Sequence, residues 1–336
     1  MPYDSAVDAA DAQRDALALM LRRAELDDLD RRLVEALQAD GRRSTVDLAR
    51  DLGTSTKTVK RRVDRLLDSG IIRITAVTTP EALGYGAIAL VGVELDGTRL
   101  AADVAAEFAR LAEADYVVVA TGRFAIYCEL FCRDTSELGR VVDERIRAAD
   151  GVRAAEIIPY LSLHYQQAQF AVARQPGVEA GAVRPVRLEP LDRAIIGALT
   201  EDGRRPFLQI AHALGVSEAQ VRQRFKAITD RGVARVMAIA NPLGLGYTTT
   251  AWVAVQIDTS QAVRDVADRL SQLPAVTYVA ICAGRFDIFA EVVCTSTDEL
   301  LRLLEDDIRT IRGIISVETS LYLDLHYKRL VPLDVV

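Results

Sequence analysis

The chain has 336 residues, a formal net charge of -7, 50% apolar residues and 26% charged residues. This is the composition of an ordinary globular protein, and the length suits two to four compact units rather than one small core. No apolar run approaches the roughly 20 residues of a membrane helix, and the charged N-terminus is unlike a signal peptide, so we expect a cytoplasmic protein without a membrane partner.

The first part of the chain is helical. Residues 8–25 predict an additional N-terminal helix that packs against a partner, since Leu17, Met20 and Leu21 lie at helical spacing. Three short helices follow between residues 29 and 70, with a serine start signal before the second and the third and a glycine after each. This arrangement predicts a helix-turn-helix, and the strand-like IIRITAVTT after it is a wing or a connecting strand.

The third helix is basic on the face that it does not bury. Val59, Val63 and Leu66 are expected to point into the core. In DNA-binding helix-turn-helix proteins the start of this helix meets the major groove, where local positive charge neutralises phosphates. We therefore predict DNA binding, against the alternative of a solvated charged face. The candidate contacts are Thr54, Ser55, Thr56, Lys57, Thr58, Lys60, Arg61 and Arg62.

Strands and helices alternate in the next part of the chain. In order, the segments are AIALVGVEL, RLAADVAAEFARLA, DYVVVA, AIYCELFC, TSELGRVVDERIRAADG and VRAAEIIPYLSLHY. The order βαββαβ is the split βαβ, ferredoxin-like arrangement. Both helices cover one face of such a sheet, so the other face is expected to pair with a second sheet.

The whole module is then repeated with an offset of 162 residues. LDRRLVEALQADGRR at Leu29 recurs as LDRAIIGALTEDGRR at Leu191, and GRF at Gly122 recurs at Gly284. A period this long indicates duplication of a module and not a solenoid. The predicted fold class is α+β, with two repeats of a winged helix-turn-helix followed by a ferredoxin-like βαββαβ domain.

We predict six segments from this pattern. They are an N-terminal helical arm (1–25), a helix-turn-helix domain (26–80), a ferredoxin-like domain (81–165), a linker rich in Ala, Gly, Pro and Val (166–187), a second helix-turn-helix domain (188–242) and a second ferredoxin-like domain (243–336).

The second helix-turn-helix carries a weaker charge signal. Residues 216–227 contain three basic residues and one acid, against five and one in residues 54–65. We expect weaker or differently specific DNA binding, and a purely structural domain is the alternative. The candidate contacts are Ser217, Gln220, Arg222, Gln223 and Arg224.

The cysteines and histidines do not indicate a metal site or a disulfide framework, because no CxxC pair occurs and the three histidines are scattered. Cys132 and Cys294 lie at apolar strand ends and are expected to be buried. His164 and His326 occupy equivalent strand positions, which predicts a sheet-face contact in preference to catalysis, and His212 is expected to be exposed.

The order of helix-turn-helix, connecting strand and βαββαβ domain resembles the Lrp/AsnC feast/famine family of transcription regulators. LGY before the first sheet strand and a glycine turn between the second and third strands add to this resemblance, which covers nearly the whole chain. It implies binding of double-stranded DNA, pairing through the βαββαβ domains, and a response to amino acids or related metabolites near that turn.

The chain departs from ordinary members of that family by fusing two copies. We infer that one chain folds as a pseudo-dimer with its two sheets facing each other, and we expect a homodimer of such chains or a higher assembly. The family commonly has an aspartate three residues after the turn glycine, as in GRFD but not in GRFA. The resemblance thus favours the second turn as an effector site, against a plain hairpin with solvent-facing charges. The candidate effector residues are Gly122, Arg123, Gly284, Arg285 and Asp287.

Two alternative functions follow from the same pattern. The architecture also resembles sirohaem decarboxylases, but the His and Arg residues expected around the first sheet strand are missing from GYGAIALVGVEL and GYTTTAWVAVQI. No Walker loop, GxSxG or HExxH occurs, so we predict no catalytic residue, no metal and no cofactor. The other alternative is a metabolite-binding protein without DNA binding, which predicts no salt-dependent affinity for DNA.

Overall fold

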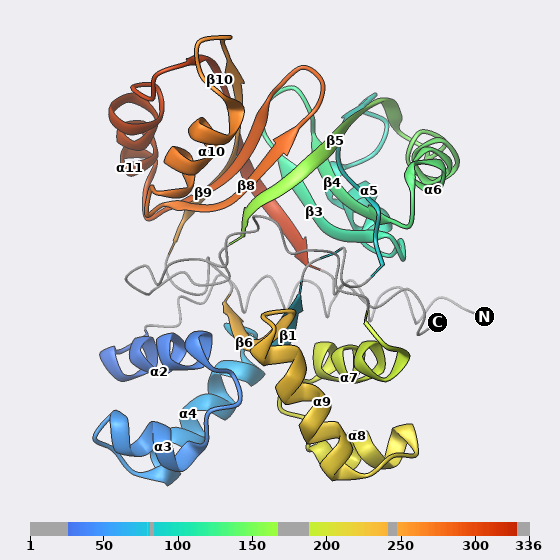
Figure 1. Cartoon of the computed structure of the whole chain (residues 1–336). Helices are drawn as coiled ribbons and strands as arrows, with labels where there is room; N and C mark the ends of the chain where they lie inside the picture. Colours follow the sequence, from blue (N-terminus) through green and yellow to red (C-terminus); the bar gives the residue numbers. More distant parts are fainter. Residues whose placement is uncertain (1–25, 79, 81–83, 167–187, 241–246, 328–336) are drawn as a thin grey trace, which may run out of the picture.

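The computed structural model describes residues 26–78, 80, 84–166, 188–240 and 247–327. The predicted helix at 8–25 and, beyond Gln166, the predicted linker lie outside these residues. Two helical units lie side by side below a β-barrel, and a pair of strands stands between them and the barrel (Figure 1). Among the described helices, none is both long and apolar enough to span a bilayer.

Each repeat forms the three predicted helices. In the first repeat they are α2 (Asp28–Ala39), α3 (Thr45–Asp51) and α4 (Thr56–Asp68), and in the second α7 (Pro190–Glu201), α8 (Phe207–Leu214) and α9 (Glu218–Asp230). Ser55 and Ser217 begin the third helices, because each hydroxyl accepts a hydrogen bond from the backbone N–H three residues later. The predicted glycine stops also hold, since Gly53 and Gly215 adopt positive φ angles of 65° and 66°.

The strand after each helix-turn-helix connects the two repeats. β1 (Ile72–Thr78) pairs antiparallel with β6 (Ala234–Ala240), with Thr75 opposite Met237. Among the described residues neither strand pairs within its own repeat, so of the two sequence interpretations the connecting strand is the one observed. This ribbon joins the two helical units into one body with a continuous apolar core.

Reciprocal contacts beside the ribbon fix the two helical units further. Arg42 donates to the carbonyl oxygen of Arg205 at 3.2 Å, and its repeat equivalent Arg204 donates to that of Gly41 at 2.9 Å. The N–H of Gly41 donates to Val236, and that of Gly203 donates to Ile74. The hydrogen bonds between the two helical units, from backbone N–H groups and from arginine side chains, therefore fix the position of α4 relative to α9.

Replacing Gly203 by alanine is expected to lower the free energy of unfolding by about 1–3 kcal/mol, as overpacking does. An added Cβ would lie 2.8 Å from the backbone nitrogen of Thr75, which cannot move without disturbing the β1–β6 ribbon. Gly139→Ala is the control, because a Cβ in α6 (Thr135–Val141) meets nothing within 4 Å. Urea unfolding of both variants measures the difference, and equal stabilities would contradict a tight junction.

The ferredoxin-like part of the first repeat has the predicted order. It comprises β2 (Ala87–Leu95), α5 (Ala101–Phe108), β3 (Ala114–Ala120), β4 (Ile126–Cys132), α6 with the π-helix η2 (Val142–Ile146), and β5 (Val152–Gln166). The second repeat gives β7 (Thr249–Ile257), α10 (Val263–Ser271), β8 (Val276–Cys282), β9 (Ile288–Cys294), α11 (Thr297–Arg302) with η4 (Leu303–Ile308), and β10 (Ile314–Tyr327).

The two sheets close into one eight-stranded barrel, in the order β10-β3-β4-β2-β5-β8-β9-β7. Each long last strand bridges the repeats: β5 pairs with β2 and with β8, and β10 pairs with β7 and with β3. The helices cover the outside (Figure 1), and one apolar cluster lies between helices and sheet in each repeat. A further cluster, rich in aromatic rings, fills the inside of the barrel. The predicted pairing of the two sheets within one chain is confirmed.

Candidate DNA-binding and effector surfaces

The exposed face of α4 carries the first group of predicted site residues. Val59, Val63 and Leu66 are buried, as the spacing predicts, so the start of the helix presents its other side to solvent. Thr56, Lys57, Lys60 and Arg61 are exposed there, whereas Thr54 is half-buried. Ser55 and Thr58 hydrogen-bond each other at 2.9 Å and cap the helix.

Two cations on this face, Lys57 and Arg61, have no partner within the described part of the chain. A third, Lys60, lies 2.7 Å from Asp64, and both side chains of this pair are largely exposed. Lys57 and Arg61 make no hydrogen bond or ion pair with any residue that the structure describes. Their charges are thus free for phosphate or base edges. An open groove follows the helix, lined by Lys57, Thr58, Lys60, Arg61, Asp64, Arg65, Asp68 and Ser69.

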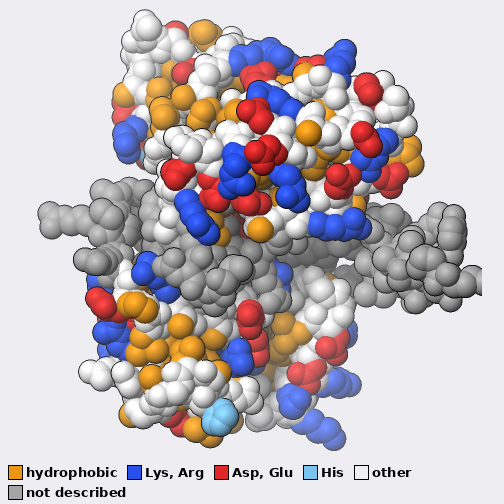
Figure 2. Space-filling view, turned by 90° about the vertical axis from the view of Figure 1, so that its right-hand side faces the viewer, with side chains coloured by type: hydrophobic (Ala, Val, Ile, Leu, Met, Phe, Trp, Pro, Cys, Tyr) orange, Lys and Arg blue, Asp and Glu red, His pale blue; other side chains and the backbone are white. Residues whose placement is uncertain are grey.

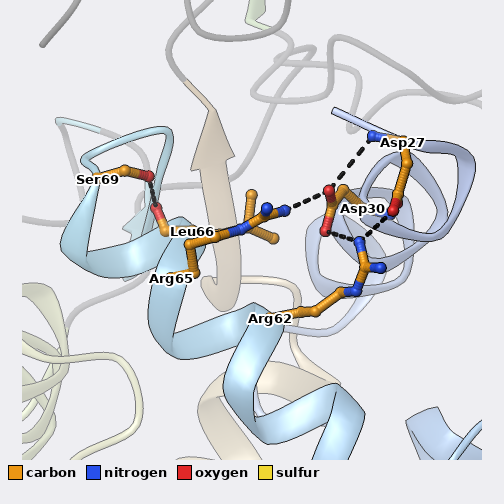
Figure 3. A network of polar contacts seen from close by, with 6 residues as sticks. All are labelled: Asp27, Asp30, Arg62, Arg65, Leu66 and Ser69. Atoms are coloured by element: carbon orange, nitrogen blue, oxygen red, sulfur yellow. Dashed lines mark hydrogen bonds and ion pairs between the residues drawn. The ribbon is translucent and has the colours of Figure 1, made fainter. Parts of the chain in front are cut away.

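Arg62 is oriented differently from the other predicted contacts and is a correction to the sequence-based set. Its guanidinium lies 2.9 Å from Asp30 and also donates to Asp27, and its side chain is only 21% exposed (Figure 3). Arg65 reaches the other oxygen of Asp30, whose side chain is 1% exposed. The hydrogen bonds that Arg62 donates to the carboxylates of Asp27 and Asp30 raise its pKa. Arg62 therefore holds α4 against α2.

The cations of α9 are neutralised by its own repeat. Arg222 donates to Glu218 at 2.9 Å, and Lys226 pairs with Asp230. Arg224 grips the buried Asp192 with two hydrogen bonds, at 2.7 and 2.6 Å, so it is a second correction and matches Arg62 in the first repeat. Of the other predicted contacts, Gln220 and Gln223 are exposed and Ser217 caps the helix.

Sequence reasoning missed the aromatic and cationic stack beside α9. The guanidinium of Arg42, from the first repeat, lies 4.2 Å from the ring centre of Phe207, and that of Arg222 lies 5.2 Å from it. Phe207 also packs on Phe225 of α9. Where α7–α9 face the viewer, hydrophobic side chains gather on the surface (Figure 2). The recognition helix of the second repeat thus lies in a more apolar and more compensated setting than α4.

The first predicted effector turn lies between β3 and β4. Gly122 has a φ of 99°, and a Cβ there would lie 3.2 Å from Ser320 of the other repeat. Arg123 is held by Glu94 at 3.3 Å and by Glu156 at 3.1 Å. Both carboxylates belong to the same repeat as Arg123. The guanidinium of Arg123 is therefore already neutralised within its own repeat.

The second predicted effector turn lies between β8 and β9. Gly284 has a φ of 125° and open space around its α-carbon, and Arg285 is paired with Glu318. Asp287 accepts a hydrogen bond from the backbone N–H of Ile257 at 2.8 Å through one carboxylate oxygen. Asp287 therefore stabilises the turn through the backbone of β7. Arg285 and Asp287 share this turn, but their side-chain partners are different residues.

The two strand histidines make different contacts. His164 lies 2.8 Å from Asp268 on helix α10, whereas His326 lies 3.5 Å from Asp324 on its own strand, so the structure does not give them the one shared sheet-face contact that the sequence predicts. His212 is exposed. Cys132 and Cys294 are buried and unpaired, as are Cys128 and Cys282.

Comparison with protein families matches both repeats. The model of the AsnC-type helix-turn-helix domain matches residues 26–67 and again 188–228. The Lrp/AsnC ligand binding domain matches residues 250–331, and a C-terminal dimeric alpha+beta barrel domain matches residues 87–172. An uncharacterized HTH-type transcriptional regulator of Pyrococcus furiosus is 41% identical over 135 residues, which are 40% of this chain and 90% of that protein. The chain belongs to the Lrp/AsnC family of transcription regulators.

Other relatives of this Lrp/AsnC chain also match one repeat's length. The HTH-type transcriptional regulator FL11 of Pyrococcus furiosus is 28% identical over 151 residues, 45% of this chain and 99% of that protein. Among solved structures, the siroheme decarboxylase NirDL covers 91% of this chain and 94% of its own, with a TM-score of 0.61 and 18% identity. That likeness shows a shared fold over most of both chains.

Proposed function

We propose that the chain is a sequence-specific DNA-binding transcription regulator in which α4 supplies most of the DNA contact. The observation that carries this proposal is the contrast between the equivalent helices. On α4, Lys57 and Arg61 are unpaired among the described residues; on α9, Ala219 and Gln223 stand at these positions. Glu218 stands at the position equivalent to the exposed Thr56. Its carboxylate would repel a phosphate, whereas the hydroxyl of Thr56 can donate a hydrogen bond to one.

The junction between the helical units supports a defined operator geometry. The β1–β6 ribbon and the Arg42 and Arg204 contacts hold α4 and α9 in one body. A rigid pair of unequal recognition helices fits a DNA site with fixed half-site spacing and without perfect two-fold symmetry. Hydroxyl-radical footprinting tests this, and a symmetric footprint over both half-sites would contradict the unequal roles.

Fluorescence anisotropy with DNA from upstream of the protein's own coding region tests the proposed function. We expect tight binding that falls steeply as salt rises, because released counterions drive phosphate contacts. A scrambled duplex of the same length is the control for sequence selectivity. Binding that is equally weak to both duplexes would reject the regulator and would direct the next assay to tetrapyrroles or to metabolites alone.

We further propose that an amino acid or related small metabolite binds at the second turn, around Gly284, Arg285 and Asp287. The family match of residues 250–331 to a ligand binding domain supports this position. Among the described residues, Arg285 pairs with a single carboxylate, Glu318, and is 38% exposed, so its other N–H donors can take a ligand carboxylate, and the second oxygen of Asp287 is available for an ammonium. In the first turn, Arg123 is held by two carboxylates and Ala125 replaces the aspartate.

Asp287→Asn is expected to weaken binding of the responsive amino acid about tenfold or more, since a charge-assisted hydrogen bond becomes a neutral one. Asparagine keeps an oxygen for the N–H of Ile257, so the turn is retained. Calorimetric titration with each of the twenty amino acids gives the measurement, and Arg123→Ala is the matched control in the first turn. Unchanged affinity in Asp287→Asn would remove Asp287 from the effector site.

We also propose that two pseudo-dimeric chains associate into a homodimer or a higher assembly. The molar mass measured by light scattering tests this proposal.

We further propose that the six predicted segments are the chain's domain division. Limited proteolysis tests this division, with cleavage expected at residues 166–187.

A further inference from the structure

Two glutamates lie inside the barrel at equivalent positions of the repeats. Glu129 on β4 is 5% exposed, and Glu291 on β9 is 7% exposed. The surrounding cluster is apolar and aromatic, with Leu90, Trp252 and Phe289 among its buried members. A carboxyl group inside an apolar barrel is costly when charged, unless it is hydrogen-bonded or paired.

Hydroxyl groups are the partners of both carboxyls. Glu129 accepts from Tyr160 at 2.9 Å and from Tyr278 at 2.7 Å, both through the oxygen Oε1. Glu291 accepts from Tyr116 and Tyr322 through Oε1, and from Thr277 at 2.6 Å through Oε2. Within the described part of the chain, Glu291 thus has three hydrogen-bond donors and Glu129 has two, although their strands are related by the repeat.

Each glutamate joins the two halves of the barrel. Tyr278 lies opposite Glu291 in the β8–β9 register, yet its hydroxyl crosses to Glu129. In the same way, Tyr116 lies opposite Glu129 in the β3–β4 register and its hydroxyl crosses to Glu291. Both carboxyl groups therefore lie at the interface between the two repeats, where each accepts a hydrogen bond from a tyrosine of the other repeat.

No cation among the described residues pairs with either carboxyl. The titratable groups that interact with Glu129 are Tyr160 on β5, Tyr278 and Cys282 on β8, Glu291 on β9, and the adjacent Cys128, whose side chain lies on the other face of β4. Burial raises the pKa of Glu129 to about 7; the two tyrosine hydroxyls oppose this rise and the charge of Glu291 adds to it. The same burial raises the pKa of Tyr160 and Tyr278, so both remain donors.

We propose that Glu129 is a proton-linked switch in the contact between the two halves of the barrel: the neutral carboxyl favours the closed barrel, and its ionisation loosens the contact. A carboxyl whose pKa is higher in the folded state stabilises that state fully at acid pH. This contribution is lost as the pH rises through the folded-state pKa, which here is about 7.

The switch lies next to both effector turns. Strand β4, which carries Glu129, begins directly after the first turn, and β8, which carries Tyr278, ends just before the second. Each turn also bonds to the long strand of the opposite half, through Thr121 to Leu321 and through Ala283 to Pro159, both at 2.9 Å. A looser contact between the halves would therefore move both turns relative to these strands.

Urea unfolding at about pH 6 and about pH 9 tests the switch in the full chain. Trp252 is the chain's single tryptophan, and its ring centre lies 5.7 Å from that of Tyr278, so its fluorescence reports on this contact. Between these pH values the wild-type unfolding constant is expected to rise about tenfold more than that of Glu129→Gln, which cannot ionise. Glu291→Gln removes the neighbouring charge that adds to the rise of the Glu129 pKa, so its loss of stability with rising pH should keep the wild-type sign and occur at lower pH. Equal pH dependence in the wild type and in Glu129→Gln would reject the proposal.

Infrared spectroscopy of the wild type keeps the test valid if Glu129→Gln does not fold. The proposal predicts a buried carboxyl C=O band that disappears around pH 7. In Tyr278→Phe, which lacks one hydrogen bond to the carboxylate, the band should disappear at higher pH. A spectrum in which every carboxyl band is lost below about pH 5, the ordinary range for glutamate, would overturn the proposal.

Discussion

The double variant Lys57→Ala/Arg61→Ala is expected to bind operator DNA about a hundredfold more weakly than the wild type. Both side chains are exposed near the start of α4 and have no partner among the described residues. A contact to a base edge or phosphate is worth about 1–3 kcal/mol, and two such losses give this magnitude. Neither side chain packs in the core, so the free energy of unfolding should hardly change.

The salt dependence separates this loss from a change of fold. Removing two phosphate contacts should reduce the slope of log affinity against log salt by about 2, as anisotropy titrations at several salt concentrations would show. Lys226→Ala is the matched control: this lysine is 75% exposed on α9 and paired with Asp230, and its loss should change affinity by less than about threefold. If both variants weaken binding alike, the unequal roles of the two helices are wrong.

The repeat and its two-part module could be predicted from sequence, because helix and strand periods differ and each stretch occurs twice. The faces of the helices followed too: Val59, Val63 and Leu66 lie at one spacing and are buried. The inward face of each sheet was unpartnered in its own repeat, which required a second sheet. The closed barrel is the geometric result of that requirement.

Long-range pairings could not be predicted in the same way. The position of Arg62 on the basic helix predicts a DNA contact, whereas its partner Asp30 lies 32 residues earlier on α2. A signal existed in the second repeat, where Asp192 and Arg224 recur at the same positions. Arg62 is present in both copies, as Arg224 in the second, whereas Lys57 and Arg61 are replaced by uncharged residues there. This difference indicates that Arg62 belongs to a structural ion pair.

Glu129 and Glu291 carry a similar signal in the sequence. Each is the single acid within an apolar strand, IYCELFC and IFAEVVC, at equivalent positions. An acid so placed needs partners, but the tyrosines come from other strands and partly from the other repeat. Only the register of the closed barrel brings them together, and the β1–β6 ribbon is hidden for the same reason.

Replacing Asp30 by asparagine is expected to lower the free energy of unfolding by about 3 kcal/mol, as judged by urea unfolding. Asp30 is 1% exposed, and it pairs with Arg62 and Arg65 between α2 and α4 (Figure 3). Loss of the carboxylate leaves the mostly buried guanidinium of Arg62 with Asp27 as its remaining acid, and breaking a buried pair typically costs about 3–5 kcal/mol. We expect the lower end, because Arg65 is half-exposed and can turn to water.

Asp64→Asn removes a carboxylate from the same helix and serves as the control. Its pair with Lys60 is exposed, so the change should stay within about 0.5 kcal/mol. The two variants also decide what Arg62 does. If Arg62 only holds α4 in place, Asp30→Asn should weaken operator binding at conditions where the protein is folded, because the helix is less well positioned. If the freed arginines were DNA contacts, the same variant would bind more tightly and show a steeper salt dependence, and Arg62 would be a DNA contact as its sequence position predicts.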